Sequence, residues 1–170
     1  RLCNACAVSG DEQEVRTIVL EQVRPQVSEV RVDAMGNVLA FRPGQGAAPR
    51  LKVMLAAHMD EVGLMIVDDE GDGIFRFDTV GGLDVRQLAG KPVWVGRQRL
   101  PGVIGAKPVH LTSAEERKTA LCLDTLRIDI GPDNGKKVKV GDRATFATKF
   151  ARVGPSLRAK ALDDRLGVAT

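Results

Sequence analysis

The chain has 170 residues, 44% hydrophobic and 28% charged, which is enough for one large domain or two small ones. Its net charge of +3 comes from well-mixed basic and acidic residues, and only 4% of residues are aromatic, so composition gives no support for nucleic-acid binding. No apolar run approaches the roughly 18 residues of a membrane span, and no secretory signal follows Arg1, so we expect no membrane partner. Because the chain does not begin with Met, we expect its natural start to lie upstream.

Three cysteines, Cys3, Cys6 and Cys122, do not suggest a disulfide framework and favour reduced thiols in the cytoplasm. Cys3 and Cys6 form a C-x-x-C pair. A four-ligand zinc site would need a second pair or matching histidines, and only His110 and Cys122 remain. No strand precedes the pair, as a thioredoxin-like motif would require. We expect the two thiols to pack beside the start of a helix.

A helix is predicted over residues 9–23. Ser9 followed by Glu12 has the spacing of a capping box, and Pro25 ends the pattern. One apolar face at helical spacing is formed by Val15, Ile18, Val19 and Val23.

Three strands are predicted next. Residues 28–33 and 37–42 alternate around a turn in which Gly36 supplies a positive φ. The apolar run LKVMLAA, residues 51–57, is typical of a strand buried on both faces.

After Asp68 the sequence changes to short β-rich pieces separated by glycine, which favours a small all-β barrel or sandwich. The one helix expected there opens at Ser113, with Glu116 completing a second capping box and His110 packing just before it. The final segment, residues 155–170, resembles the first segment in its sequence pattern. We therefore expect an α/β domain (1–68 and 155–170) interrupted by a β-rich insertion (69–154).

His58 and Asp60 lie between the apolar run 51–57 and a second apolar run, at the predicted carboxyl end of a strand, where α/β sheets place ligands. A metal-binding imidazole usually has its other nitrogen held by a carboxylate, and His-x-Asp could supply both groups. The alternative is a core histidine paired with a nearby acid.

The segment Lys160–Arg165 holds two adjacent carboxylates before a presumed helix. Asp163 or Asp164 could serve as its N-cap, with Arg165 pairing with either. Alternatively, Asp163 could bridge two metal ions, which lie ~3.5–4 Å apart in such sites.

Several segments together resemble a known family. In chain order they are LCNACAVSGDEQEVR, RVDAMGNVLAF, AAHMDEVGLMI, VGGLD, GVIGAKPVHLTSAEERK, LRIDIG, VKVGDRATF and AKALDDRLG. They are similar to the N-terminal half of the dinuclear metallo-aminopeptidases, which include the glutamyl, deblocking and large tetrahedral aminopeptidases. Some members were once labelled endoglucanases.

The resemblance implies a catalytic α/β domain with a mixed sheet and an inserted β-barrel-like dimerisation domain. Dimers would assemble into a tetrahedral dodecamer that degrades short peptides. Two divalent ions, zinc or cobalt, would bind the site. By the family's motifs, His58 would bind one metal, Asp60 would support it in catalysis, and Asp163 would bridge both.

The family's general base and remaining ligands lie beyond the motifs matched here, so these residues cannot build a complete two-metal site by themselves. The leading hypothesis is thus a metal-dependent aminopeptidase that removes N-terminal residues from short peptides, with this chain as its N-terminal half. One alternative is a non-catalytic assembly module. The other is an endoglucanase, although no pair of carboxylates stands out for glycoside hydrolysis.

Overall fold

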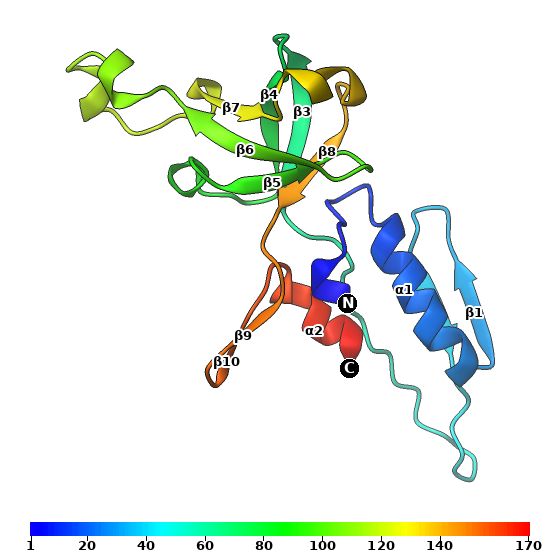
Figure 1. The fold of residues 1–170 in the computed structure, drawn as a ribbon. Coiled ribbons are helices and arrows are strands. Elements are labelled where there is room, and N and C mark those ends of the chain that lie inside the picture. Colours follow the sequence, from blue (N-terminus) through cyan, green and yellow to red (C-terminus); the bar gives the residue numbers. More distant parts are fainter. The chain divides into compact units, whose positions relative to one another are not determined.

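The computed structural model describes residues 1–115 and 117–170, and the chain divides into two compact units. One unit combines residues 1–61 with residues 150–170, and the other holds residues 62–149 (Figure 1). Among the described residues, no helix is both long and apolar enough to cross a membrane.

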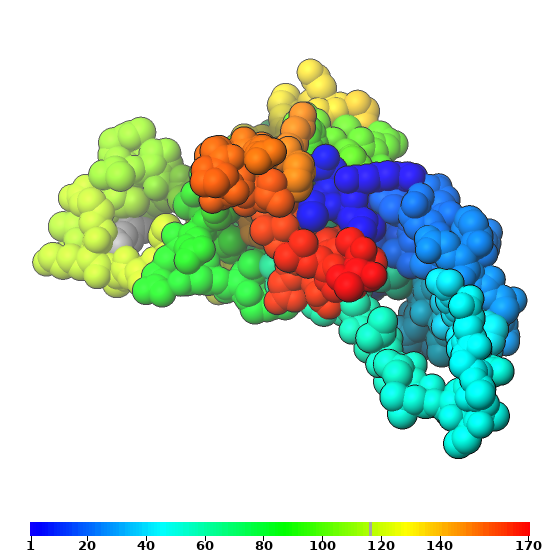
Figure 2. Space-filling view, turned by 90° about the horizontal axis from the view of Figure 1, so that it is seen from below, coloured from blue at the N-terminus to red at the C-terminus, as the bar shows by residue number. Residues whose placement is uncertain are grey.

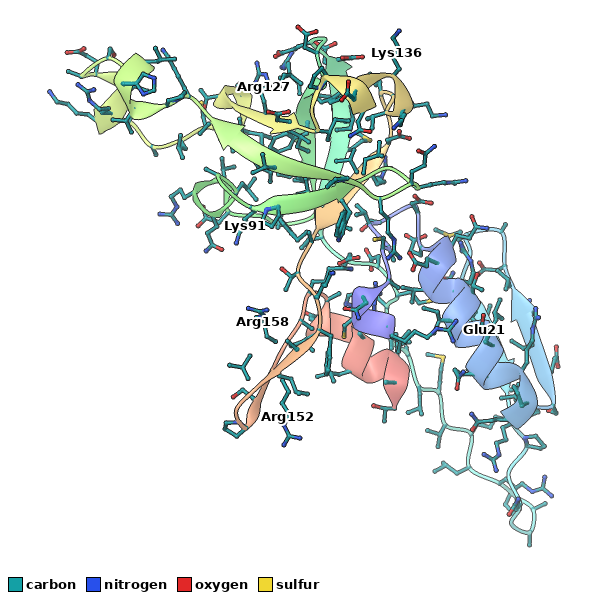
Figure 3. All side chains as sticks on the ribbon, in the orientation of Figure 1. Glu21, Lys91, Arg127, Lys136, Arg152 and Arg158 are labelled. Carbon is teal, nitrogen blue, oxygen red and sulfur yellow. The ribbon has the colours of Figure 1, made fainter. Side chains whose placement is uncertain are left out.

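The first unit carries both α-helices and two short hairpins. Its elements are η1 (Leu2–Asn4), α1 (Gln13–Val23), η2 (Arg24–Gln26), β1 (Glu29–Val32), β2 (Val38–Phe41), β9 (Ala151–Val153), β10 (Ser156–Arg158) and α2 (Leu162–Ala169). Strand β1 pairs with β2, and β9 with β10, both antiparallel. Exposed Arg152 and Arg158 mark the second hairpin in Figure 3. The small buried core of this unit contains Ala5, Ala7, Val15 and Ile18.

The predicted first helix forms as α1, but the predicted capping box does not. The helix ends at Val23, and Pro25 lies in the first turn of η2. Ser9 lies too far before Gln13 to cap it, and its hydroxyl donates to Asp60 instead. The sequence signal therefore located the helix correctly and assigned the wrong partner to Ser9.

The predicted hairpin is confirmed as β1 and β2, with Gly36 at φ +89° in its turn. A side chain at Gly36 would also meet Arg16, whose Nη1 donates to the Gly36 carbonyl at 3.1 Å. Glycine is favoured here by the backbone conformation, whereas the flexible end of the Arg16 side chain could move to make room for a Cβ.

The predicted buried strand at residues 51–57 is wrong. These residues have no regular structure, and Leu51, Met54 and Leu55 are each more than 85% exposed. Figure 2 shows this part of the chain, in cyan and teal, as a narrow arm. A strand buried on both faces needs neighbouring strands in its sheet, and none of the described strands pairs with residues 51–57. The apolar composition alone therefore did not predict their structure.

The second unit is a closed six-stranded barrel, which confirms the predicted small β domain. Its strands are β3 (Gly63–Asp69), β4 (Ile74–Val80), β5 (Pro92–Val95), β6 (Leu100–Ala106), β7 (Leu126–Asp129) and β8 (Arg143–Phe146). They follow the order β3-β4-β7-β6-β5-β8 around the barrel. Inward-facing residues alternate along the strands, as in Leu64 and Ile66 of β3 or Phe75 and Phe77 of β4, and form one buried cluster.

Short 3-10 turns complete the barrel unit. They are η3 (Val85–Gln87), η4 (Val109–Leu111), η5 (Glu116–Lys118), η6 (Leu123–Thr125) and η7 (Pro132–Lys137). The helix predicted to open at Ser113 is not an α-helix among the described residues there, and the Glu116 part of that prediction lies outside them. His110 was expected to pack and is exposed.

The barrel unit begins at Val62 and ends at Lys149, whereas the expected insertion runs from 69 to 154. The apolar run after Asp60 becomes β3, whose Leu64 and Ile66 pack into the barrel. Composition alone could not assign this run to one unit, because an apolar run suits the core of either.

Candidate metal centre

His58 sits between two carboxylates. Its Nδ1 lies 2.8 Å from Oδ1 of Asp60, and its Nε2 lies 3.0 Å from Oδ1 of Asp163. His58 and Asp60 follow the irregular segment rather than a strand, which corrects the predicted strand-end position. The structure thus brings together all three residues that the sequence singled out, from segments 105 positions apart.

The surroundings of the three groups differ. The side chains of His58 and Asp163 are 54% and 94% exposed, while that of Asp60 is 35% exposed. The hydrogen bond with Asp163, followed by that with Asp60, raises the pKa of His58 because both carboxylates favour the imidazolium. The Ser9 hydroxyl, and then His58, lower the pKa of Asp60. Asp60 is therefore a firmly ionised, oriented partner for the ring.

Asp163 and Asp164 play different local roles. They lie at the kinked start of α2, joined by a cis peptide bond, and neither has helical backbone angles. Oδ1 of Asp164 accepts from the Gly167 amide at 2.9 Å, which is the bond of an N-cap. The N-cap position of α2 as a whole is Ala161, so Asp164 caps only the regular turns after the kink, and the Asp163 carboxylate faces His58.

Arg165 does not pair with either aspartate, contrary to the sequence interpretation. Its side chain is buried, with Nη2 3.8 Å from Oε1 of Glu61 and Nε 3.4 Å from the Leu2 carbonyl. Burial lowers the pKa of Arg165, and the Glu61 carboxylate opposes that shift. The position of Arg165 after two aspartates suggested a local pair, but the turn into α2 points it into the core.

The donors fit a divalent ion in kind but not in number. With metal–ligand distances of about 2.0–2.2 Å, two ligands of one ion lie roughly 3 Å apart. The His58 Nε2 to Asp163 Oδ1 distance is of this size, and Asp60 holds the other ring nitrogen, as outer partners of metal-bound histidines do. Among the described residues, however, no group of three or more His, Cys, Asp or Glu side chains could hold a metal.

The C-x-x-C pair is not part of this centre. Cys3 and Cys6 are half-buried, Cys122 is exposed, and none of the three forms a disulfide. The Cys6 amide donates to Glu14 of α1 at 2.9 Å, which ties the pair to the helix start.

Sequence reasoning missed three residues near the centre. Ser9 orients Asp60, and Glu61 forms a buried ion pair with Lys160. The only sequence signal was position, because Glu61 directly follows Asp60 and Lys160 shortly precedes Asp163.

Comparison with protein families matches residues 36–170 to the family described as M42 glutamyl aminopeptidase. The chain belongs to this family. An M42 assignment agrees with the resemblance found in the sequence motifs and with the mixed α/β architecture containing a closed barrel.

Individual relatives agree. A lysyl aminopeptidase of Pyrococcus furiosus is 30% identical over 98% of this chain and 50% of its own length. The crystal structure of a TET aminopeptidase from Thaumarchaeota archaeon SCGC AB-539-E09 matches with a TM-score of 0.88 and 32% identity, covering 98% of this chain and 48% of that one.

Two further structures bear on assembly and on the alternative activity. Pyrococcus horikoshii TET1 peptidase, described as assembling into a tetrahedron or a large octahedral shell, matches with a TM-score of 0.82 and 34% identity over 98% of this chain and 51% of its own. A Thermotoga maritima structure described as an endoglucanase matches with a TM-score of 0.81 and 34% identity, covering 98% of this chain and 50% of that one. The M42 chain therefore spans about half the length of the proteins it matches.

Proposed function

We propose that the complete protein is a metal-dependent aminopeptidase that hydrolyses N-terminal residues from short peptides. Membership of the M42 family supports hydrolysis of peptides. The observation that carries the proposal is the arrangement of His58, with Asp60 on one ring nitrogen and Asp163 on the other.

His58 and Asp163 are the residues of this chain that would hold metal, His58 on one ion and Asp163 between two. When bound, two divalent ions, zinc or cobalt, would polarise the scissile carbonyl and activate a water. Asp60 would fix the His58 tautomer through Nδ1, so that Nε2 is available as a ligand. The remaining ligands and the general base would come from the half of the family's chain that these residues do not match.

The proposal extends to the two units and to assembly. Residues 1–61 and 150–170 would belong to the catalytic domain, and the barrel of residues 62–149 would be the dimerisation domain. Similarity to a peptidase that assembles into a tetrahedron supports a homo-oligomer, from dimer to dodecamer. Cysteines without disulfides fit a reducing compartment, and we place the protein in the cytoplasm.

The test uses the full-length protein loaded with Zn²⁺ or Co²⁺ and short peptides with free or acetylated N-termini. We expect the protein to release the first residue only from peptides with a free N-terminus. Chelation should abolish this activity, and added metal should restore it. Hydrolysis of a β-glucan instead would support the endoglucanase alternative. An oligomer that binds no metal and cleaves neither substrate would support the non-catalytic assembly module.

A further inference from the structure

A cluster of three charged side chains is buried in the first unit. Glu61, Lys160 and Arg165 are 5%, 9% and 1% exposed. Lys160 Nζ donates to both oxygens of Glu61, at 2.7 and 2.9 Å, and also to the Ala5 carbonyl. Glu61 Oε1 further accepts from the Ala7 amide at 3.0 Å. The Glu61 carboxylate is therefore the centre of a network that involves three separate segments of the chain.

Two of these segments also carry the candidate metal centre. Glu61 directly follows Asp60, Lys160 precedes Asp163, and Arg165 follows it. The Glu61 amide also donates to the Ala7 carbonyl at 2.9 Å, and Val8 and Glu61 form a parallel bridge. The network thus fixes where the segment with His58 and Asp60 lies relative to the segment with Asp163.

Stability alone does not explain such a network. Replacing a buried ion pair by apolar residues of similar volume is often neutral or stabilising, since burial removes both charges from water. Here Nη1 and Nη2 of Arg165 are also buried without hydrogen-bond partners among the described residues. What a buried pair supplies, and an apolar contact does not, is a direction and a fixed length for each bond.

We propose that Glu61 and Lys160 are positioning residues for the metal centre. Their ion pair holds residues 58–61 against residues 160–163 in the register that places His58 Nε2 3.0 Å from Asp163 Oδ1. In this role the two side chains position the ligands and do not themselves bind the metal. The inference rests on the proposed function, because it assigns to this pair the geometry of that same centre.

The experiment measures Co²⁺ binding by the full-length protein, using affinity and the visible absorption of bound Co²⁺, which reports ligand geometry. Glu61→Asp keeps the charge and shortens the reach, and the double variant Glu61→Gln/Lys160→Met removes both charges and keeps similar volume. Glu14→Gln is the matched control, because Glu14 also accepts from the N-terminal segment, through the Cys6 amide, but lies on α1, outside residues 58–61 and 160–163. Val15→Ala, a fully buried position in the same unit, controls for lost stability.

Both network variants should bind Co²⁺ about 10–100-fold more weakly than the wild type, with a changed absorption spectrum. Both controls should bind normally while folded. Wild-type affinity and spectrum in either folded network variant would overturn the inference and leave the proposed function standing. A wild-type protein that binds no Co²⁺ would instead overturn the metal centre itself.

Discussion

Both ring nitrogens of the histidine at the centre of the site face a carboxylate. One ring nitrogen of His58 faces Asp60, the other faces Asp163, and the two carboxylates differ in exposure and in their own partners. This asymmetry supports the proposed roles of Asp60 as an orienting group and Asp163 as a ligand, because the Ser9 hydroxyl and His58 both restrain Asp60, whereas Asp163 is almost fully exposed.

His58→Ala should remove one metal ion and nearly all peptidase activity from the full-length protein, because His58 is the only histidine in residues 1–61 and 150–170. If the barrel is the dimerisation domain, assembly should be unchanged, since the substitution lies outside residues 62–149. Metal content, peptide hydrolysis and size-exclusion chromatography measure the three outcomes. Near-normal turnover would show that His58 is not a metal ligand.

Asp60→Asn should have a smaller effect. The amide keeps the shape of the side chain but loses the charge that favours one orientation and tautomer of the ring, so metal affinity should fall by about 10–100-fold. Zn²⁺ titration against a competing chelator measures the change. An affinity equal to that of the wild type would mean that Asp60 has only a structural role.

At the scale of single elements, glycines decide how the barrel strands are joined. Gly73 precedes β4 with φ +79°, and its carbonyl accepts from the Ile130 amide at 3.0 Å. A Cβ there would lie 2.1 Å from the Gly131 carbonyl oxygen. Gly71 has a similar φ of +86° but open space around it. Comparing substitutions at Gly73 and Gly71 therefore separates the cost of backbone strain from the cost of a steric clash.

Gly73→Ala should destabilise the protein more than Gly71→Ala. Both substitutions impose a left-handed conformation on alanine, which costs about 1–2 kcal/mol, and only Gly73→Ala adds the clash with backbone. Urea unfolding followed by circular dichroism gives both free energies of unfolding. Equal losses would show that the strand connection can shift to relieve the contact.

The elements that sequence predicted well are those specified by local signals. Helix α1, the hairpin around Gly36 and the barrel strands each follow from periodicity and turn residues within a short window. The segment 51–57 failed because burial of a strand depends on a neighbour that no local pattern reveals. The Ser9 cap failed for a related reason, since a hydroxyl can bond a carboxylate that is distant in sequence.

The site was predictable to a similar extent. His58, Asp60 and Asp163 came from motifs, and the structure shows that they meet. The burial of Glu61, Lys160 and Arg165 was not predicted, because a charged residue in a mixed sequence gives no sign of burial until the chain folds.

At the scale of the whole molecule, each unit has its own buried core, so the roles proposed for the units can be tested independently. The barrel core contains Phe75, which is completely buried, and the core of the other unit contains Val15, which is equally buried. Phe75→Ala should cost about 3–5 kcal/mol of stability. Val15→Ala should cost roughly 2 kcal/mol.

If the barrel is the dimerisation domain, Phe75→Ala should make the oligomer dissociate at a lower urea concentration than the wild type. Val15→Ala should lose metal binding first and keep the oligomer, because it weakens the unit that holds His58 and Asp163. Analytical ultracentrifugation and Co²⁺ absorption across one urea series record both properties. Dissociation of the Val15→Ala oligomer at the lower urea concentration, with Phe75→Ala behaving as the wild type, would assign assembly to the other unit.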